Sequence, residues 1–230
     1  ELFSRGGNSL FSDSIQSSTL PNLVILGAPI GDFVYCSRFF PQKCHLFKDL
    51  LRSIIDVSAV DLHVAFSLLR MCGGYSKSVH LARSTPTSLC SDSLKFFDEE
   101  VKLCLGSCLA VDIPDTQWQQ AQLSPSTGGL GLHSLSLHSS AVIISLLAVS
   151  DLRSPDNIYL QQAICHYNTW VTPQDSLAIE TVLNTPPQQR ALSQKLDSHL
   201  FHKLLTSASP VNKARLLSTY SPHDGLWISA

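Results

Sequence analysis

The chain is poor in charge. Only 15% of its 230 residues are Asp, Glu, Lys or Arg, and the formal net charge is −2. Because the chain has no overall excess of positive charge, any binding to nucleic acid has to use local basic patches. The hydrophobic content of 44% is that of a folded chain, since disordered segments are polar and highly charged. A chain of this length predicts one or two domains.

Long apolar runs are also missing. The longest, Ala141–Ile144 and then Leu146–Val149, is about half of the ~20 residues that a membrane span needs, so it predicts a buried helix. The chain begins at Glu1, with no Met and no signal-peptide pattern, so we expect a fragment with no membrane partner. The seven cysteines are scattered, which favours reduced thiols in an intracellular protein, cytoplasmic or nuclear.

Catalytic motifs are absent. No two aspartates are adjacent, whereas two-metal polymerisation needs carboxylates that hold two cations about 4 Å apart. The acidic cluster Asp98–Glu100 falls on the polar face of a predicted helix, which favours a solvated surface over a metal site. A Gly-x-Ser-x-Gly nucleophile elbow is missing, and the adjacent Cys165 and His166 point in different directions on a helix. We therefore assign no catalytic residue and expect no enzyme.

Potential metal ligands occur only in weak pairs. Cys104 and Cys108 lie at i and i+4 on a predicted helix, and His199 and His202 at i and i+3. No second pair follows at zinc-finger spacing. Both cysteines fall on an apolar stripe, where buried thiols are the ordinary outcome. We therefore expect no metal.

A glycine-rich segment, Gly128–Leu132, invites a nucleotide-binding interpretation. A Rossmann loop follows a strand and carries a third glycine, whereas this segment follows Leu123–Thr127 and has Ser134 at that position. A tight turn that leads into the apolar helix predicted over Leu135–Val149 explains the glycines better. The sequence therefore predicts no cofactor.

Helical periodicity dominates from Lys43 onward. Apolar residues recur at every third or fourth position, as in helices that bury one face. The only strand signal is Leu23–Leu26, which ends at Gly27 and is followed by a turn or edge segment. The stripes are Leu46, Leu50 and Ile54; Leu62, Ala65, Phe66 and Leu69; Leu94, Phe97, Val101, Cys104, Leu105 and Cys108; Leu160, Ala163, Ile164 and Tyr167; and Leu192, Leu196, Leu200 and Leu204. The predicted fold is mainly α: a helical bundle with a short N-terminal strand or hairpin.

Seven of the twelve prolines follow Ser or Thr. A Ser or Thr cap with Pro at the first helical position satisfies or removes free N–H donors, so such pairs predict helix starts. Ser154-Pro155, Thr172-Pro173 and Ser209-Pro210 fit this pattern best. Proline-directed phosphorylation is the alternative that the sequence leaves open.

Basic residues cluster in two segments. Six lie within 43–83 against three Asp, and five lie within 188–217 against Asp197 alone, whereas 92–115 holds six acids and two lysines. Either basic segment could contact phosphates, each contact adding a salt-dependent increment, and a solvated face explains both equally well. The candidate nucleic-acid-binding residues are Lys77, Arg83, Arg190, Lys195, Lys203, Lys213 and Arg215.

Four blocks resemble, in the same order, the region that follows the catalytic palm in reverse transcriptases of non-LTR retrotransposons. They are Leu26–Asp32 (LGAPIGD); Leu68–Tyr75 with His80–Arg83 and Thr85-Pro86; Gln122–Pro125 with Gly128–Leu132 (GGLGL); and Ser207–Leu217 followed by Tyr220–Ala230 (YSPHDGLWISA). The family's Tyr/Phe-x-Asp-Asp motif is missing from this chain. The resemblance therefore implies a helical thumb-like and connection region beside a polymerase active site, without that site's catalytic carboxylates.

The same resemblance implies three parts. Residues 1–42 are an irregular lead-in with the short strand, 43–121 are thumb-like helices, and 122–230 are a helical connection region. It implies a noncatalytic remnant of the retrotransposon protein, with an RNA–DNA or DNA duplex as its partner. The alternative is a helical protein-interaction or scaffold domain with no role in nucleic-acid binding.

Overall fold

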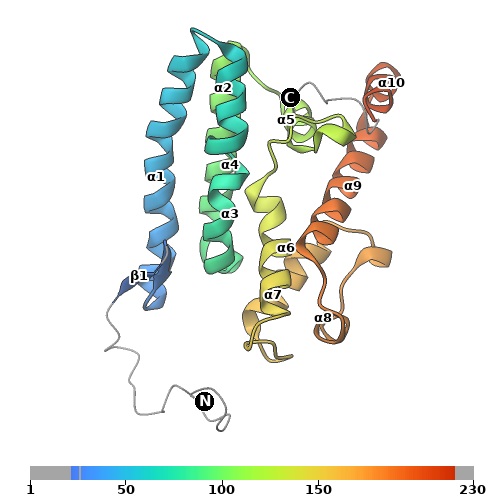
Figure 1. Cartoon of the computed structure of the whole chain (residues 1–230). Coiled ribbons are helices and arrows are strands. Elements are labelled where there is room, and N and C mark those ends of the chain that lie inside the picture. The colour runs from blue at the N-terminus through green and yellow to red at the C-terminus, as the bar shows by residue number, and fades with distance from the viewer. Residues whose placement is uncertain (1–21, 26, 221–230) are drawn as a thin grey trace.

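The computed structural model describes residues 22–25 and 27–220. The lead-in expected over residues 1–20, and residues 221–230 of the closing block, lie outside the described residues. Within the described part the chain is mainly α, as the periodicity predicts, with a two-stranded antiparallel sheet near its N-terminal end (Figure 1). No helix in these ranges has the length and apolar character that crossing a membrane requires.

Two groups of helices lie side by side, α1 to α4 in one and α6 to α9 in the other (Figure 1). In chain order the elements are β1 (Leu23–Ile25), β2 (Ala28–Ile30), α1 (Phe33–Ser58), α2 (Leu62–Leu68), the π-helical turn η2 (Leu69–Gly73), α3 (Tyr75–Ser84), α4 (Thr87–Leu109), α5 (Asp115–Gln122), the 3₁₀ turn η3 (Pro125–Thr127), α6 (Leu135–Leu147), α7 (Ile158–Asn168), the 3₁₀ turn η4 (Pro173–Asp175), α8 (Ile179–Asn184), α9 (Gln189–Ser207) and α10 (Pro210–Ser218). Helix α6 joins the groups, because it packs against α3 and α4 on one side and against α7 and α9 on the other.

The predicted strand is half of a short hairpin. Leu23 pairs with Ile30, and Ile25 pairs with Ala28. Gly27 adopts the left-handed backbone (φ 82°) that reverses the chain between the two strands. The N-terminal strand or hairpin expected from the sequence is therefore confirmed.

Helix α1 starts earlier than the hydrophobic period indicates, at Phe33 rather than Lys43. Its start is set by Asp32, whose carboxylate accepts a hydrogen bond from the backbone N–H of Tyr35 at 2.7 Å. Pro41 lies inside the helix. Residues 33–42, predicted as part of an irregular lead-in, are therefore helical, because a polar cap defines the start of this helix and the apolar stripe does not.

Helices α1 and α4 form the first core and run in the same direction. The thiol of Cys44 contacts the carbonyl oxygen of Ser93 at 3.7 Å, and the thiol of Cys104 contacts that of Leu51 at 3.6 Å. The stripe predicted from Leu94 to Cys108 faces this core, with all but the partly buried Cys108 fully buried. The stripe of α4 thus faces the core as the periodicity indicates. On α1 the predicted stripe is wrong in part, because Leu46 is 63% exposed and the core is filled by Cys44, Leu51 and Ile54 instead.

Helix α6 is apolar nearly all round and is buried along most of its length, as predicted. It forms the second core with α7 and α9, whose predicted stripes also face inward. The glycines before it make the expected tight turn: a Cβ at Gly129 would collide with the carbonyl oxygens of Leu123 and Gln120. Gly128 and Gly131 adopt left-handed backbone, which glycine reaches without strain.

Two of the three Ser/Thr-Pro pairs begin a helical segment, and the third does not. Ser209 caps α10 with Pro210 in its first turn, as predicted, and Pro173 opens the η4 turn. Ser154-Pro155 forms a turn instead. Helix α7 is capped by Asn157, whose side-chain oxygen accepts hydrogen bonds from two backbone N–H groups. Asn is as effective a helix N-cap as Ser. Helix α7 therefore begins at Ile158, after Asn157, rather than at Pro155.

The solvated position predicted for Asp98 is wrong. Asp98 is 7% exposed, and its carboxylate accepts four hydrogen bonds at the start of α6. The donors are the N–H groups of Leu135 (2.7 Å) and Ser136 (3.0 Å) and the hydroxyls of Ser134 and Ser136 (both 2.6 Å). Burial raises the pKa of Asp98, and these donors act in the opposite direction. A side chain of α4 thus holds the first turn of α6, where the helix dipole favours negative charge.

We expect Asp98→Ala to lower the free energy of unfolding by about 2–4 kcal/mol, because it leaves buried N–H donors of α6 without their acceptor. Glu99→Ala removes an exposed neighbour of equal charge and should change stability by less than about 0.5 kcal/mol. Denaturant unfolding of both variants measures the difference. Equal stability of the two variants would contradict the capping role.

Candidate functional site

Helix α9 has one face in the core and one face in solvent. Its leucines and its only carboxylate, that of Asp197, face inward. Asp197 is 7% exposed. The side chains of Lys195, His202 and Lys203 are exposed on the outer surface. Because the acid is buried, the outer face of α9 carries only neutral or basic side chains.

Among the candidate nucleic-acid-binding residues, Lys195 has its positive charge partly compensated by a nearby carboxylate. Its Nζ lies 2.9 Å from Oδ1 of Asp175, which belongs to the η4 turn. Nε2 of His199 lies 2.9 Å from the other oxygen of the same carboxylate. The hydrogen bonds from Lys195 and His199 hold the pKa of Asp175 below its usual range. Asp175 therefore offsets part of the positive charge on this surface.

Lys203 lies over an aromatic ring. Its Nζ is 5.8 Å from the ring centroid of Trp170, within the range of a cation–π contact. Trp170 is 42% exposed, so a cation and a solvent-facing indole share one place on the surface. The sequence places Trp170 only at the end of a helical stripe, and nothing in that position indicates its partner on α9.

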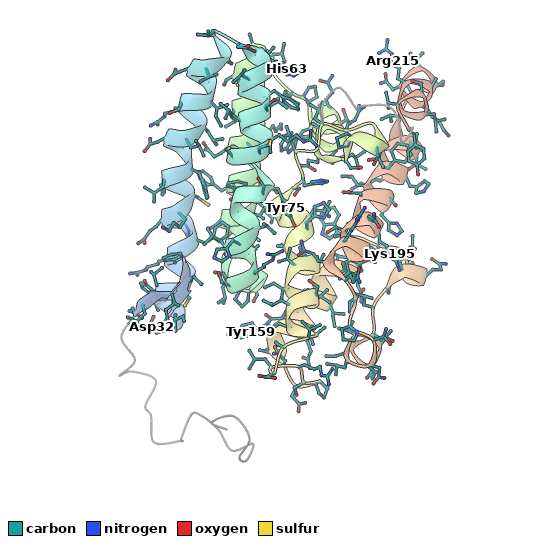
Figure 2. The ribbon with its side chains drawn as sticks, viewed as in Figure 1. Asp32, His63, Tyr75, Tyr159, Lys195 and Arg215 are labelled. Carbon is teal, nitrogen blue, oxygen red and sulfur yellow. The ribbon has the colours of Figure 1, made fainter. Side chains whose placement is uncertain are left out.

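Helix α10 adds Lys213 and Arg215, both exposed. Arg215 lines a hollow of about 540 Å³ between α5 and the α9–α10 corner, together with the polar side chains of Gln117, Gln120 and Asn212. In Figure 2 the labelled Lys195 and Arg215 lie on the α9–α10 side of the molecule, away from α1. We call the exposed Lys195, Lys203, Lys213 and Arg215 the basic strip of α9 and α10. Of these four residues, Arg215 lines the hollow.

Two of the candidate nucleic-acid-binding residues, Arg83 and Arg190, lie where α3 approaches the start of α9. A guanidinium nitrogen of Arg83 donates to the side-chain oxygen of Gln189 at 3.1 Å, and the exposed Arg190 is the next residue along α9. Lys77 lies in α3, and its side chain is outside the described residues. The structure therefore brings Arg83 and Arg190 to one junction, at the opposite end of α9 from α10.

Two of the six basic residues of segment 43–83 pair with acids on α1 and α4. Lys48 lies 2.9 Å from Glu100, and Arg52 lies 3.1 Å from Asp49. Glu100 belongs to the acidic stretch of α4, so α1 presents mixed charge. The sequence alone does not distinguish the two basic segments. The ion pairs of the structure favour 188–217 over 43–83 as the cationic surface.

A second constellation lies inside the molecule, and we call it the His-His-Asp cluster. It consists of His133 in the turn before α6, His138 on α6 and Asp197 on α9. The ring edges of both histidines meet the ring of Tyr75, with centroids 5.8 Å apart in each case. Burial, helped by the nearby charges of His138 and Arg70, lowers the pKa of His133. The cluster is the residue set in the described ranges that could hold a metal ion.

The pairs considered from sequence do not form this cluster. The Cys104 thiol is buried against α1, and Cys108 is only partly buried. His199 pairs with Asp175, whereas His202 is exposed. The sequence does not reveal this cluster because Asp197 lies in a segment far along the chain from His133 and His138.

Comparison with protein-family models finds no match, and comparisons with curated proteins and with solved structures likewise find none.

The cysteines are all free thiols, and their burial predicts their reactivity. Burial raises the pKa of Cys44, Cys90 and Cys104 to about 12 in each case, so these thiols stay protonated at neutral pH and resist alkylation. Cys72 and Cys165 are exposed. We expect iodoacetamide at pH 8 to modify these two first in the folded protein, as read by peptide mass spectrometry. Early labelling of Cys104 would contradict the packing of α1 against α4.

Proposed function

We propose that this chain is a noncatalytic remnant of a non-LTR retrotransposon reverse transcriptase whose α9–α10 surface binds a nucleic-acid duplex. The ordered blocks from Leu26 to Ala230 support the lineage, and the lack of adjacent aspartates supports the absence of polymerase catalysis. The mainly α fold is the architecture that a thumb-like and connection region implies.

The observation that carries the binding proposal is the burial of Asp197. Residues 188–217 contain five basic side chains and this single acid, and the acid faces the core. The outside of the segment is therefore cationic although the whole chain has a net charge of −2. Local positive strips of this kind attract the phosphate backbone and release its counterions.

The length of the strip fits a backbone contact. Helix α9 has 19 residues, which at the helical rise gives about 28 Å between the Arg83–Gln189 junction and the α10 corner. A duplex carries a phosphate on each strand about every 3.4 Å along its axis, so several phosphates pass along such a length. Lys195 and Lys203, eight residues apart, lie within about 80° of each other around α9, so they can contact one backbone at separate points.

The aromatic side chains beside the strip favour nucleic acid over a simple solvated surface. Trp170 lies under Lys203, and Tyr220, 57% exposed, stacks on Phe201 with ring centroids 4.8 Å apart. Exposed rings next to cations stack on bases at frayed ends or single-stranded stretches.

The test is the salt dependence of duplex binding. We expect a fluorescent RNA–DNA hybrid to bind the protein, with log affinity falling against log salt by about 0.9 for each phosphate contacted. The combined variant K195A/K203A/K213A/R215A should bind more weakly and show a slope shallower by about 2–4 units, because it removes up to four such contacts. Fluorescence anisotropy at several salt concentrations measures both quantities.

The matched control is R38A/R52A, which removes exposed positive charge from α1 and should leave the slope unchanged. Asp175→Asn should strengthen binding, because it frees Lys195 from its ion pair. A folded wild-type protein without salt-dependent duplex binding would rule out the proposal and leave the helical protein-interaction domain as the better alternative. An equal loss in the α1 control would assign the binding to general charge instead of this surface.

A further inference from the structure

Three polar atoms converge inside the molecule, between α6 and α9. The candidate ligand atoms of His133, His138 and Asp197 all lie within 4.8 Å of one another. Nδ1 of His133, Nε2 of His138 and Oδ1 of Asp197 are each buried without a hydrogen-bond partner. Buried polar atoms are almost always paired, because losing water without gaining a partner is unfavourable. Three such atoms at one point need a common explanation.

The three groups do not satisfy one another. His138 Nε2 lies 3.2 Å from Asp197 Oδ1, and His133 Nδ1 lies 3.9 Å from Asp197 Oδ2. These are ion-pair distances, but neither contact has hydrogen-bond geometry, since the nitrogens remain unpartnered. The two rings stand at 82° to each other, with centroids 5.3 Å apart. Both nitrogens therefore border the same carboxylate without pairing to it.

We propose that His133, His138 and Asp197 bind a divalent transition-metal ion, and that Zn²⁺ matches them best. Two imidazole nitrogens and one carboxylate oxygen, with a fourth position open to water, form a common tetrahedral zinc ligand set. Mg²⁺ and Ca²⁺ prefer ligand sets made of oxygen alone. A single bound ion would satisfy all three unpartnered atoms at once.

The separations are close to those that such an ion requires. Zinc–nitrogen bonds of about 2.0–2.1 Å in a tetrahedron place neighbouring ligand atoms ~3.3 Å apart. The 3.2 Å between His138 and Asp197 already meets this value. The ligand atom of His133 lies within 4.8 Å of the other two. It therefore has to approach by at most about 1.5 Å to reach tetrahedral spacing. His133 lies in the loop before α6, and its side chain is 31% exposed. That exposure also gives the ion and a water molecule a route to the site.

The surroundings fix two ligands and moderate the affinity. His138 is 2% exposed, and Asp197 is held on α9 among the buried leucines. Tyr75 closes one side, and its hydroxyl accepts a hydrogen bond from Gln189. The charge of Arg70, which acts on His133, opposes a cation. We therefore expect weaker binding than at a closed four-ligand structural zinc site. This proposal does not depend on duplex binding.

The test uses Zn²⁺ and its spectroscopic substitute Co²⁺ on the full chain after treatment with a chelator. We expect one equivalent of Co²⁺ to give the visible absorption of a four-coordinate nitrogen–oxygen site, which Zn²⁺ then displaces. Added Zn²⁺ should raise the thermal unfolding midpoint, because it binds the folded state. His133→Ala and Asp197→Asn should each weaken binding more than about tenfold.

His202→Ala is the matched control, because it removes an exposed histidine from the same helix as Asp197 and should leave binding unchanged. Far-UV circular dichroism checks that each variant is folded. His133 lies in a partly exposed turn, so its variant remains informative even if Asp197→Asn unfolds. A folded wild-type protein that binds neither ion would overturn the proposal. So would binding that survives His133→Ala or that is lost equally in His202→Ala.

Discussion

The carboxylate of Asp98, on α4, holds the first turn of α6 and thereby places the helix that lies between the two apolar cores. Helix α6 is the one element among the described residues that packs against both α3–α4 and α7–α9. Its start is held by a carboxylate from α4, through two backbone N–H groups and two hydroxyls. This polar contact fixes the position and direction of α6 between the two apolar cores. Hydrogen bonds from Arg83 to Gln189 and from Gln189 to Tyr75 add a direct link between α3 and α9.

The orientation of α9 follows from that of α6. The inward leucines of α9 pack against α6, and Asp197 faces His138 at 3.2 Å. With its acid directed inward, α9 exposes Lys195 and Lys203 to solvent. The same helix thus contributes to a buried cluster on one side and to a cationic strip on the other. The metal proposal and the duplex proposal concern opposite faces of α9, and each can fail without the other.

The sequence predicted most of the apolar framework, because helical stripes need only local information. The exceptions are Leu46 and Leu62, which are exposed although they belong to predicted stripes. Leu192, Leu196, Leu200 and Leu204 are buried as their spacing indicates. Polar residues inside those stripes were harder to interpret. Asp98 lies four residues after Leu94 and three before Val101, both buried, so its position already marked it as inward-facing. Its partners lie 36 to 38 residues further along the chain, and no local pattern identifies them.

The candidate residues show the same limit. Lys203 and Arg215 are exposed, as basic side chains usually are. Their neighbours belong to distant segments of the chain: Trp170 lies under Lys203, and residues of α5 line the hollow beside Arg215. The difference between the two basic segments also depends on tertiary contacts, since Lys48 is compensated by Glu100 on another helix. His133 and His138 are five positions apart in a chain with nine histidines, and only the approach of Asp197 distinguishes them.

We propose that the outer face of α9 and α10 contacts the nucleic-acid backbone. Backbone hydrogen exchange, followed by mass spectrometry with and without a saturating RNA–DNA hybrid, tests it most directly. We expect slower exchange in the bound state within residues 189–217 and unchanged exchange in α1, residues 33–58. Protection confined to α1, or exchange that the duplex leaves unchanged throughout the chain, would contradict the claim.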